Sequence, residues 1–376
     1  MKKIVIFTVM LILVNAYLMA GKFEKEFTVK PGKKLTVDLD IGGSIEVRGW
    51  EKSTVNITIN YSGREFDSDA VDFRQDDSGI YVNVNNGNYY RNKGLEISAQ
   101  VPEKFDLDLE TMGGSIKISN VEGEINGKTM GGSLVLDNLK GTAEMTTMGG
   151  EIILKNAELN GKLKTMGGEV LFEDVVGNIE GISMGGDITF RNVRIKEGTP
   201  RGHGGVVKVS SMGGEIKVDD APMGTDVHTM GGEIYVKNAH IFVKAKTMGG
   251  EINIEKIDGW IDATTMGGDV TAVMVGDPAQ GKRDVDISSK GGTIDLTLPA
   301  GISADFDIRL DYTRNSSRDF KVKSDFDIQI EESDDWIYDK GSPRKYIKGI
   351  GKINEGKNHI KIRTINGDII IRKGEK

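Results

Sequence analysis

The sequence predicts an all-β protein, specifically a single-chain parallel β-solenoid with 18-residue coils and irregular β caps at both ends. The tripeptide Met-Gly-Gly occurs nine times, and seven of the eight intervals between copies are 18 residues. Aliphatic and polar residues alternate through most of the chain after residue 20, as in strands. The chain has 50 glycines but only 7 prolines, and many of the glycines recur at fixed repeat positions. A short repeated unit cannot bury an apolar face alone, so the copies must stack on one another.

Residues 1–20 are predicted to be a secretory signal peptide. Lys2 and Lys3 precede an apolar run from Ile4 to Leu18, and Ala20 with Gly21 forms a small-residue exit typical of cleavage. We therefore expect export to the periplasm or cell surface. The alternative is an uncleaved anchor, which would hold the protein near the membrane. The chain has no cysteine, so its stability in an oxidising compartment must come from stacking.

The formal net charge of the chain is -8. Such an acidic balance disfavours a nucleic-acid partner and favours solubility by mutual repulsion.

Residues 21–110 are predicted to form an N-terminal β cap with the first irregular coils. Alternating apolar stretches at 35–40, 41–47 and 55–61 are separated by polar segments. An open solenoid end would template aggregation, so an irregular, charged cap is expected there.

Residues 111–298 are predicted to form the regular repeat. Position 1 of each unit is the Thr or Ser before the Met, positions 6 and 8 are aliphatic or Phe (Ile152 and Leu154, Val170 and Phe172), and position 10 is often Asn or Asp. Beyond position 10, small or apolar residues move from even to odd positions. Because strand side chains alternate faces, this switch predicts a corner near position 10 and another near position 1.

The methionines at position 2 share the parity of positions 6 and 8, so they are predicted to point inward and fill a gap beside the corner. The glycines that follow are predicted to adopt backbone angles closed to other residues and to let the opposite arm approach. The alternative for the methionines is binding of a soft metal or a role as an oxidation sink.

Two excursions interrupt the period. The first, around residues 197–205, contains the candidate binding-loop residues Arg201 and His203, although a plain insertion also explains it. The second lies near residues 276–284.

Position 5 faces outward and carries an acidic side chain from the third unit to the ninth. Stacking would place these carboxylates in a column with a spacing of about 4.8 Å. We interpret the column as a solvated face, partly offset by Lys128, Lys164 and Lys246, with calcium binding or partner binding as the alternatives. The candidate residues are Glu151, Glu169, Asp187, Glu215, Glu233, Glu251 and Asp269.

Val135, Ile153 and Leu171 occupy outward position 7 in consecutive units, and Tyr235 joins them farther along. This apolar strip is either a partner surface or a face covered by the terminal segments.

Residues 299–376 are predicted to form a C-terminal β cap. The stretch from 312 to 356 is strongly charged, and 360–371 repeats the corner and first arm of a coil.

The Gly-Gly-Ser-Ile pattern at Gly42, the repeated Met-Gly-Gly-Glu-Ile, the Val101-Pro102 junction and the closing Asn366-Gly367-Asp368-Ile369 resemble bacterial putative-adhesin domains of unknown function. The resemblance covers roughly residues 35–372. It implies a β-solenoid in an exported or membrane-linked envelope protein with a surface-binding role, and it brings no catalytic residues.

The four histidines show no metal-ligand spacing, and phosphate-loop and nucleophile-elbow motifs are absent from the sequence. We therefore expect no catalytic residue, metal or cofactor. The leading hypothesis is an exported, non-catalytic adhesive or scaffold module of the cell envelope, with an envelope protein or a glycan as partner. The alternatives are a polysaccharide-processing β-helix enzyme and a structural protein that self-associates end to end.

Overall fold

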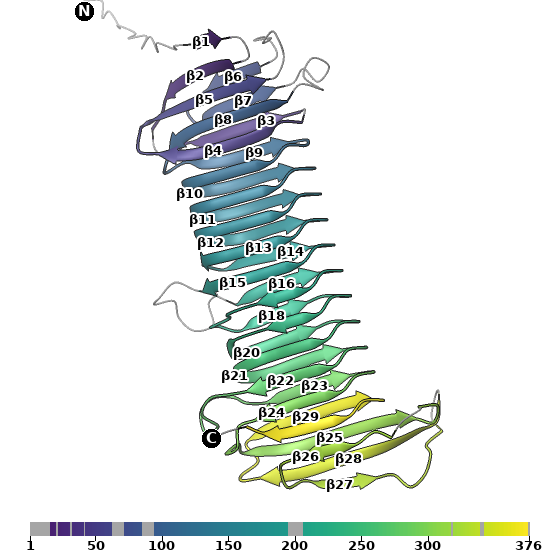
Figure 1. Cartoon of the computed structure of the whole chain (residues 1–376). Helices are drawn as coiled ribbons and strands as arrows, with labels where there is room; N and C mark the ends of the chain where they lie inside the picture. Colours follow the sequence, from purple (N-terminus) through teal and green to yellow (C-terminus); the bar gives the residue numbers. More distant parts are fainter. Residues whose placement is uncertain are drawn as a thin grey trace, which may run out of the picture. The chain divides into compact units, whose positions relative to one another are not determined.

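The computed structural model describes residues 16–19, 22–30, 32–40, 42–61, 71–84, 94–194, 206–316, 319–338 and 342–374. The described residues form strands and no helices, so the fold is all-β (Figure 1). No helix in the described residues is long and apolar enough to cross a membrane. The predicted signal peptide lies largely outside them, and only Ala16–Met19 of it is described, as strand β1. The chain divides into two compact units, residues 1–129 and 130–376.

The first unit is a mixed sheet. Strands β1, β2, β5 and β8 pair antiparallel in that order, whereas β4 pairs parallel with β8 and β10, and β9 pairs parallel with β3 and β10. The strands are β1 (Ala16–Met19), β2 (Lys22–Thr28), β3 (Lys34–Leu39), β4 (Ser44–Trp50), β5 (Thr54–Tyr61), β6 (Val71–Gln75), β7 (Gly79–Val84), β8 (Leu95–Pro102), β9 (Asp106–Thr111) and β10 (Ile116–Thr129).

The second unit carries most of the repeats, and its strands pair parallel at one repeat apart as far as β24 (Figure 1). They are β11 (Leu134–Thr147), β12 (Ile152–Thr165), β13 (Val170–Val176), β14 (Ile179–Ser183), β15 (Ile188–Arg194), β16 (Val207–Ser211), β17 (Ile216–Val218), β18 (Thr225–His228), β19 (Ile234–Val236), β20 (Ala239–Lys246), β21 (Ile252–Thr265), β22 (Val270–Met274), β23 (Val285–Ser289) and β24 (Ile294–Leu298). The C-terminal strands are β25 (Ala304–Thr313), β26 (Val322–Ser324), β27 (Gln329–Glu332), β28 (Arg344–Ile353), β29 (Asn358–Ile365) and β30 (Ile369–Lys373).

The 18-residue period is the register of the sheet. Leu134 pairs with Ile152 and Ile152 with Val170, each 18 residues on. Ile188 then pairs with Ile216, so the longer interval between Met184 and Met212 leaves the register intact. The strands on either side of the insertion therefore keep their inward side chains in register.

Positions 6 and 8 of the repeats are buried, as predicted. Ile152, Leu154 and Phe172 are each at most 1% exposed. The predicted change of direction at position 10 is also present, because Asn138, Asn156 and Asp174 take left-handed backbone angles with φ of 51–55°. Asn and Asp tolerate that region better than other non-glycine residues, which accounts for their recurrence there.

The Thr and Ser side chains at position 1 are buried, and sequence reasoning missed their role. Thr165 is fully buried; its hydroxyl donates to the carbonyl oxygen of Gly150 at 2.8 Å and accepts a hydrogen bond from the N–H of Gly168 at 3.1 Å. Thr147, Ser183, Thr247 and other position-1 residues repeat this arrangement. Each hydroxyl therefore joins the corner of its own repeat to the corner of the repeat before it.

The predicted inward direction of the methionines is wrong. In the second unit the methionines at position 2 are 36–49% exposed, whereas the position-1 residues beside them are at most 4% exposed. The chain bends immediately after the buried Thr or Ser, so the alternation of the following strand does not extend back to position 2.

The glycine pairs differ from the prediction in two respects. None of the glycines of these pairs has a left-handed φ, and the close approach is to the neighbouring repeat, not to an opposite arm. A Cβ on Gly150 would lie 2.1 Å from the carbonyl oxygen of Gly132, but a Cβ on Gly149 would meet nothing closer than 3.7 Å. Stacking therefore requires glycine at position 4 and leaves room for a side chain at position 3.

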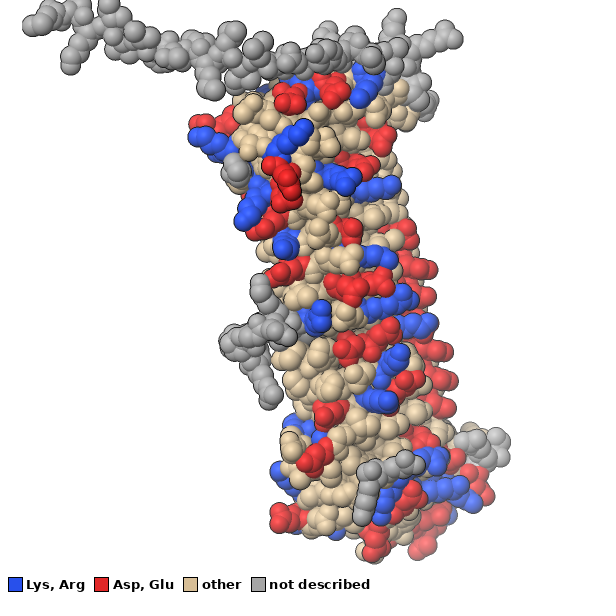
Figure 2. Space-filling model, turned by 60° about the vertical axis from the view of Figure 1, so that its left-hand side comes forward, with Lys and Arg blue, Asp and Glu red and all other residues tan. Residues whose placement is uncertain are grey.

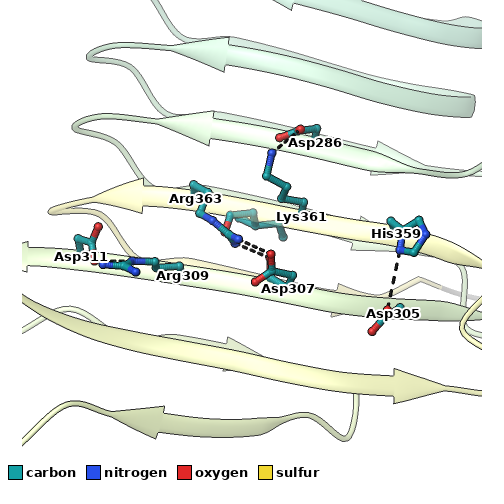
Figure 3. A network of polar contacts seen from close by, with 9 residues as sticks. Asp286, Asp305, Asp307, Arg309, Asp311, His359, Lys361 and Arg363 are labelled. Atoms are coloured by element: carbon teal, nitrogen blue, oxygen red, sulfur yellow. Dashed lines mark hydrogen bonds and ion pairs between the residues drawn. The ribbon is translucent and has the colours of Figure 1, made fainter.

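The C-terminal strands turn the sheet from parallel to antiparallel pairing. Strand β29 pairs parallel with β23 and β25, and β25 pairs antiparallel with β28. On the outward face, Lys361 contacts Asp286 at 2.8 Å, Arg363 contacts Asp307 and His359 lies 3.8 Å from Asp305 (Figure 3). Asp286 with Lys361 and Asp305 with His359 are directly paired residues of neighbouring strands, whereas Arg363 reaches diagonally to Asp307.

Candidate functional site

A groove of about 850 Å³ opens in the second unit. It lies on the second arm of the repeats, that is, on the residues that follow position 10. Its walls come from β20, β21 and two connecting segments, and most of the exposed lining is apolar. The lining residues are Val206, Pro222, Met223, His240, Ile241, Phe242, Asp258, Gly259, Trp260, Gln280, Gly281, Lys282 and Arg283.

Two aromatic rings form the centre of the groove. Phe242 and Trp260 are paired residues of adjacent strands, and their rings stack with centroids 5.0 Å apart at an angle of 18°. The ammonium group of Lys282 lies 4.9 Å from the Trp260 ring centroid. Both rings are half-buried, so stacking holds a rigid aromatic surface at the solvent boundary.

The backbone beside the rings is strained. Ile241 has a φ of 69°, which is unfavourable for a β-branched residue, and this residue is 41% exposed. Gly224, with φ +93°, makes room for the neighbouring ring, because a Cβ there would lie 2.5 Å from a Phe242 ring atom. Strain of this kind clusters at functional sites.

Arg283 fixes the segment that closes one side of the groove. Its guanidinium group is buried and donates to Asp258 Oδ1 at 2.6 Å, to the Val275 carbonyl at 2.8 Å and to the Asp277 carbonyl at 3.0 Å. One side chain thus ties the second excursion, around residues 276–284, to strand β21.

The groove was not predicted from the sequence, although one of its walls is an excursion that the sequence had marked. The candidate loop residues Arg201 and His203 lie outside the described residues, which resume at Val206. The missed signal was position 14 of the repeat, where Phe242 and Trp260 stand in consecutive units.

The acidic column at position 5 has the predicted outward direction. Glu151, Glu169, Asp187, Glu233, Glu251 and Asp269 are exposed and Glu215 is half-buried. Acidic side chains follow one another along one edge of the molecule in Figure 2. Some of them, together with the glycines of positions 3 and 4, line a shallow trough of about 670 Å³.

Two members of this column also bind the next repeat. Asp187 Oδ1 accepts a hydrogen bond from the N–H of Glu215 at 2.8 Å, and Asp269 Oδ1 accepts one from the N–H of Thr293 at 2.7 Å. These are the two aspartates of the column, and both stand where the interval to the next repeat exceeds 18 residues.

The column produces a negative local field. A hydrogen bond to Glu215, together with the charges of Glu215, Asp187 and Glu233, raises the pKa of Lys217 above its ordinary value. Within the described ranges, no cluster of three or more His, Cys, Asp or Glu side chains is arranged to hold a metal ion. The described carboxylates of the column therefore produce a negative field without forming a carboxylate cage.

The apolar strip follows the register of the sheet. Val135 pairs with Ile153 and Ile153 with Leu171, and all three are half-buried. Tyr235 is also half-buried, and its hydroxyl group hydrogen-bonds to Glu255.

Several solved structures resemble this chain. No family model matches it, and no curated protein does. One structure is a cell adhesion protein from Clostridium sporogenes, described as putative, with 12% identity, a TM-score of 0.19 and coverage of 93% of this chain and 99% of that one. A putative adhesin from Parabacteroides distasonis has 10% identity, a TM-score of 0.30 and coverage of 74% and 97%.

A third, a putative lipid binding protein from Parabacteroides distasonis, has 14% identity, a TM-score of 0.29 and coverage of 73% and 96%. The adhesin names agree with the resemblance found in the sequence. At these identities and TM-scores we draw no functional conclusion from the three structures.

Proposed function

We propose that the repeats form a parallel β-solenoid, and that the chain is an exported, non-catalytic adhesive module of the cell envelope that binds a glycan in the groove around Phe242 and Trp260. The observation that carries the proposal is the combination of side chains in this groove. An apolar aromatic surface is bordered by His240, Asp258, Gln280 and Lys282, which can hydrogen-bond to hydroxyl groups.

The register of the strands supports the solenoid. Parallel pairing at one repeat interval, with positions 6 and 8 buried in each repeat, is the arrangement that stacked coils require. The buried position-1 hydroxyls add a hydrogen bond between successive corners.

The geometry favours a rigid binding surface. The groove is built on stacked strands, and Arg283 anchors its wall, so a ligand can bind without ordering the site first.

Strand β27 has four exposed residues, two of them glutamates. Charged residues on an edge strand protect it from pairing with another chain. This favours adhesion over end-to-end self-association.

A glycan array probed with the full chain tests the proposal. We expect the wild type to bind a restricted set of glycans, and we expect this binding to be lost with Trp260→Leu and with Phe242→Leu. Binding should be kept with Tyr235→Leu, a control that removes an aromatic side chain at position 7, away from the groove. Equal binding by all four proteins would refute the assignment of the groove. Release of reducing ends from a bound polysaccharide would instead identify an enzyme.

A further inference from the structure

The exposed methionines of the second unit form one column. They are Met130, Met148, Met166, Met184, Met212, Met230, Met248 and Met266, each 36–49% exposed. Their corners lie in direct register: the N–H of Met248 donates to the carbonyl oxygen of Met230 at 3.3 Å, and the N–H of Gly231 donates to that of Met212 at 3.2 Å.

Packing does not explain this column. An inward methionine would have needed no further reason, but each of these residues is 36–49% exposed. The neighbouring position 3 is also kept as glycine although a Cβ there would meet only ordinary contacts, with nothing closer than 3.5 Å in this unit. The surface around the methionines is thereby left bare and open to solution.

Variation among the repeats points the same way. Outward position 7 takes Val135, Ile153, Leu171, Thr189 and Lys217 in consecutive repeats of this unit, so duplication has not preserved exposed residues in general. The methionine is nevertheless present in every one of these repeats. A requirement specific to the thioether explains the difference between the two positions.

The spacing suits a soft cation. Neighbouring parallel strands lie about 4.8 Å apart. This is close to twice the zinc–thiolate bond of about 2.3 Å, which sets the scale of a metal–sulfur bond. Because methionine side chains are flexible, those of adjacent repeats can bring one sulfur atom to each side of a two-coordinate cation. Thioethers select soft ions such as Cu(I) over calcium or magnesium, which prefer oxygen.

The field around the column favours a cation as well. From Met148 to Met266 a position-5 carboxylate follows each methionine by three residues, and Glu151, Glu169 and Asp187 border the glycine trough. Carboxylates alone would favour hard ions, and no described cluster of them forms a cage. The sulfur atoms supply the selectivity and the carboxylates raise the local concentration of cations.

We propose that the methionine column of the second unit is a binding site for soft monovalent cations, with Cu(I) held between the thioethers of neighbouring repeats.

Silver(I), which is soft and stable in air, is the probe for the test. Full-length protein labelled at the methionine methyl carbons is titrated with silver nitrate in chloride-free buffer and followed by NMR. The methyl resonances of the column are expected to shift, whereas those of buried Met145 and Met274, 1% and 2% exposed, stay in place as internal controls. Calcium added in tenfold excess over silver should not reverse the shifts.

A triple variant with Met148→Leu, Met166→Leu and Met184→Leu should lower the silver stoichiometry and weaken binding at these repeats about tenfold or more. Leucine has nearly the same volume, so the fold should be kept. The single variant Met166→Leu, with local methyl shifts as the readout, serves if the triple variant does not fold. A matched variant with Glu151→Gln and Glu169→Gln should weaken binding but keep the methyl shifts.

Three results would overturn the proposal: column methyls that do not respond to silver, leucine variants that bind silver as well as the wild type, or displacement of silver by calcium. Competition for Cu(I) with a chromophoric chelator under reducing conditions should give the same ranking of variants.

Discussion

The hydroxyl of Thr147 donates a hydrogen bond to the carbonyl oxygen of Gly132 at 2.7 Å, and the N–H of Gly150 donates to the same hydroxyl at 3.2 Å. One buried side chain thus links the glycine corners of two successive repeats. The same link recurs from repeat to repeat and ends with Thr364, which donates to the carbonyl oxygen of Gly292 at 2.7 Å.

Replacing Thr147 by Val should destabilise the protein by about 1–3 kcal/mol, because valine keeps the shape but leaves a partly buried carbonyl and a partly buried N–H without this partner. Urea unfolding of the full chain measures the effect. Thr147→Ser keeps the hydroxyl and should cost clearly less. Equal losses for Val and Ser would mean that the methyl group, not the hydrogen bonds, matters at position 1.

Adjacent glycines should differ in their tolerance of a methyl group. Gly150→Ala places a Cβ 2.1 Å from a backbone oxygen and should cost about 1–3 kcal/mol through backbone displacement. Gly149→Ala has room and should stay within about 0.5 kcal/mol of the wild type. Thermal melting of the two variants in parallel checks this, and a reversed order would contradict the stacking of the corners.

The sequence was sufficient to predict the strands, the inward positions and the corner at position 10, because side-chain alternation and the preference of Asn and Asp for turns are local properties. It misplaced the methionines because parity holds only within one strand. The bend after Thr165 resets it, and only the burial of that hydroxyl reveals the bend.

The groove wall should depend on Arg283. Arg283→Met removes a buried guanidinium that contacts one carboxylate and two carbonyls, and we expect a loss of about 2–3 kcal/mol. Lys282→Met, beside it on the exposed surface, should stay within about 0.5 kcal/mol. Urea midpoints give the comparison, and intact glycan binding with Arg283→Met would show that the wall is not needed for the site.

Alkaline pH should weaken the C-terminal strands through Tyr312. Burial, and then a hydrogen bond to Glu332, raise the pKa of this phenol from 10.0 to about 12. The folded state holds the proton more tightly than the unfolded chain, so this contribution to stability is complete below pH 10.0 and is lost as the pH rises through about 12.

The ultraviolet absorbance of tyrosinate, followed against pH, tests this assignment. Tyr312→Phe should remove a late-titrating phenol and flatten the loss of stability in that range. Glu332→Gln should lower the pKa part of the way. A titration curve that is unchanged by both substitutions would contradict the assignment.

The groove could not be predicted from the sequence, because its residues come together only through the register of the strands. Gly224, the left-handed Ile241 with its neighbour Phe242, and Trp260 come from three different repeats, and each looks like an ordinary departure from the pattern. Only the register of β18, β20 and β21 brings them together. The carboxylate column was easier to predict, because one residue type recurs at one position.

The central claim is that repeats stack in register with position 2 facing outward. The chain has no cysteine, so Met148→Cys combined with Met166→Cys gives a clean pair of thiols for oxidation. Adjacent strands place these residues about 4.8 Å apart, within the range for a disulfide. We predict rapid cross-linking of this pair in the folded protein and none between Met148→Cys and Met184→Cys, two repeats apart. Thiols that are buried and unreactive at 148 and 166, or equal cross-linking of both pairs, would contradict the account.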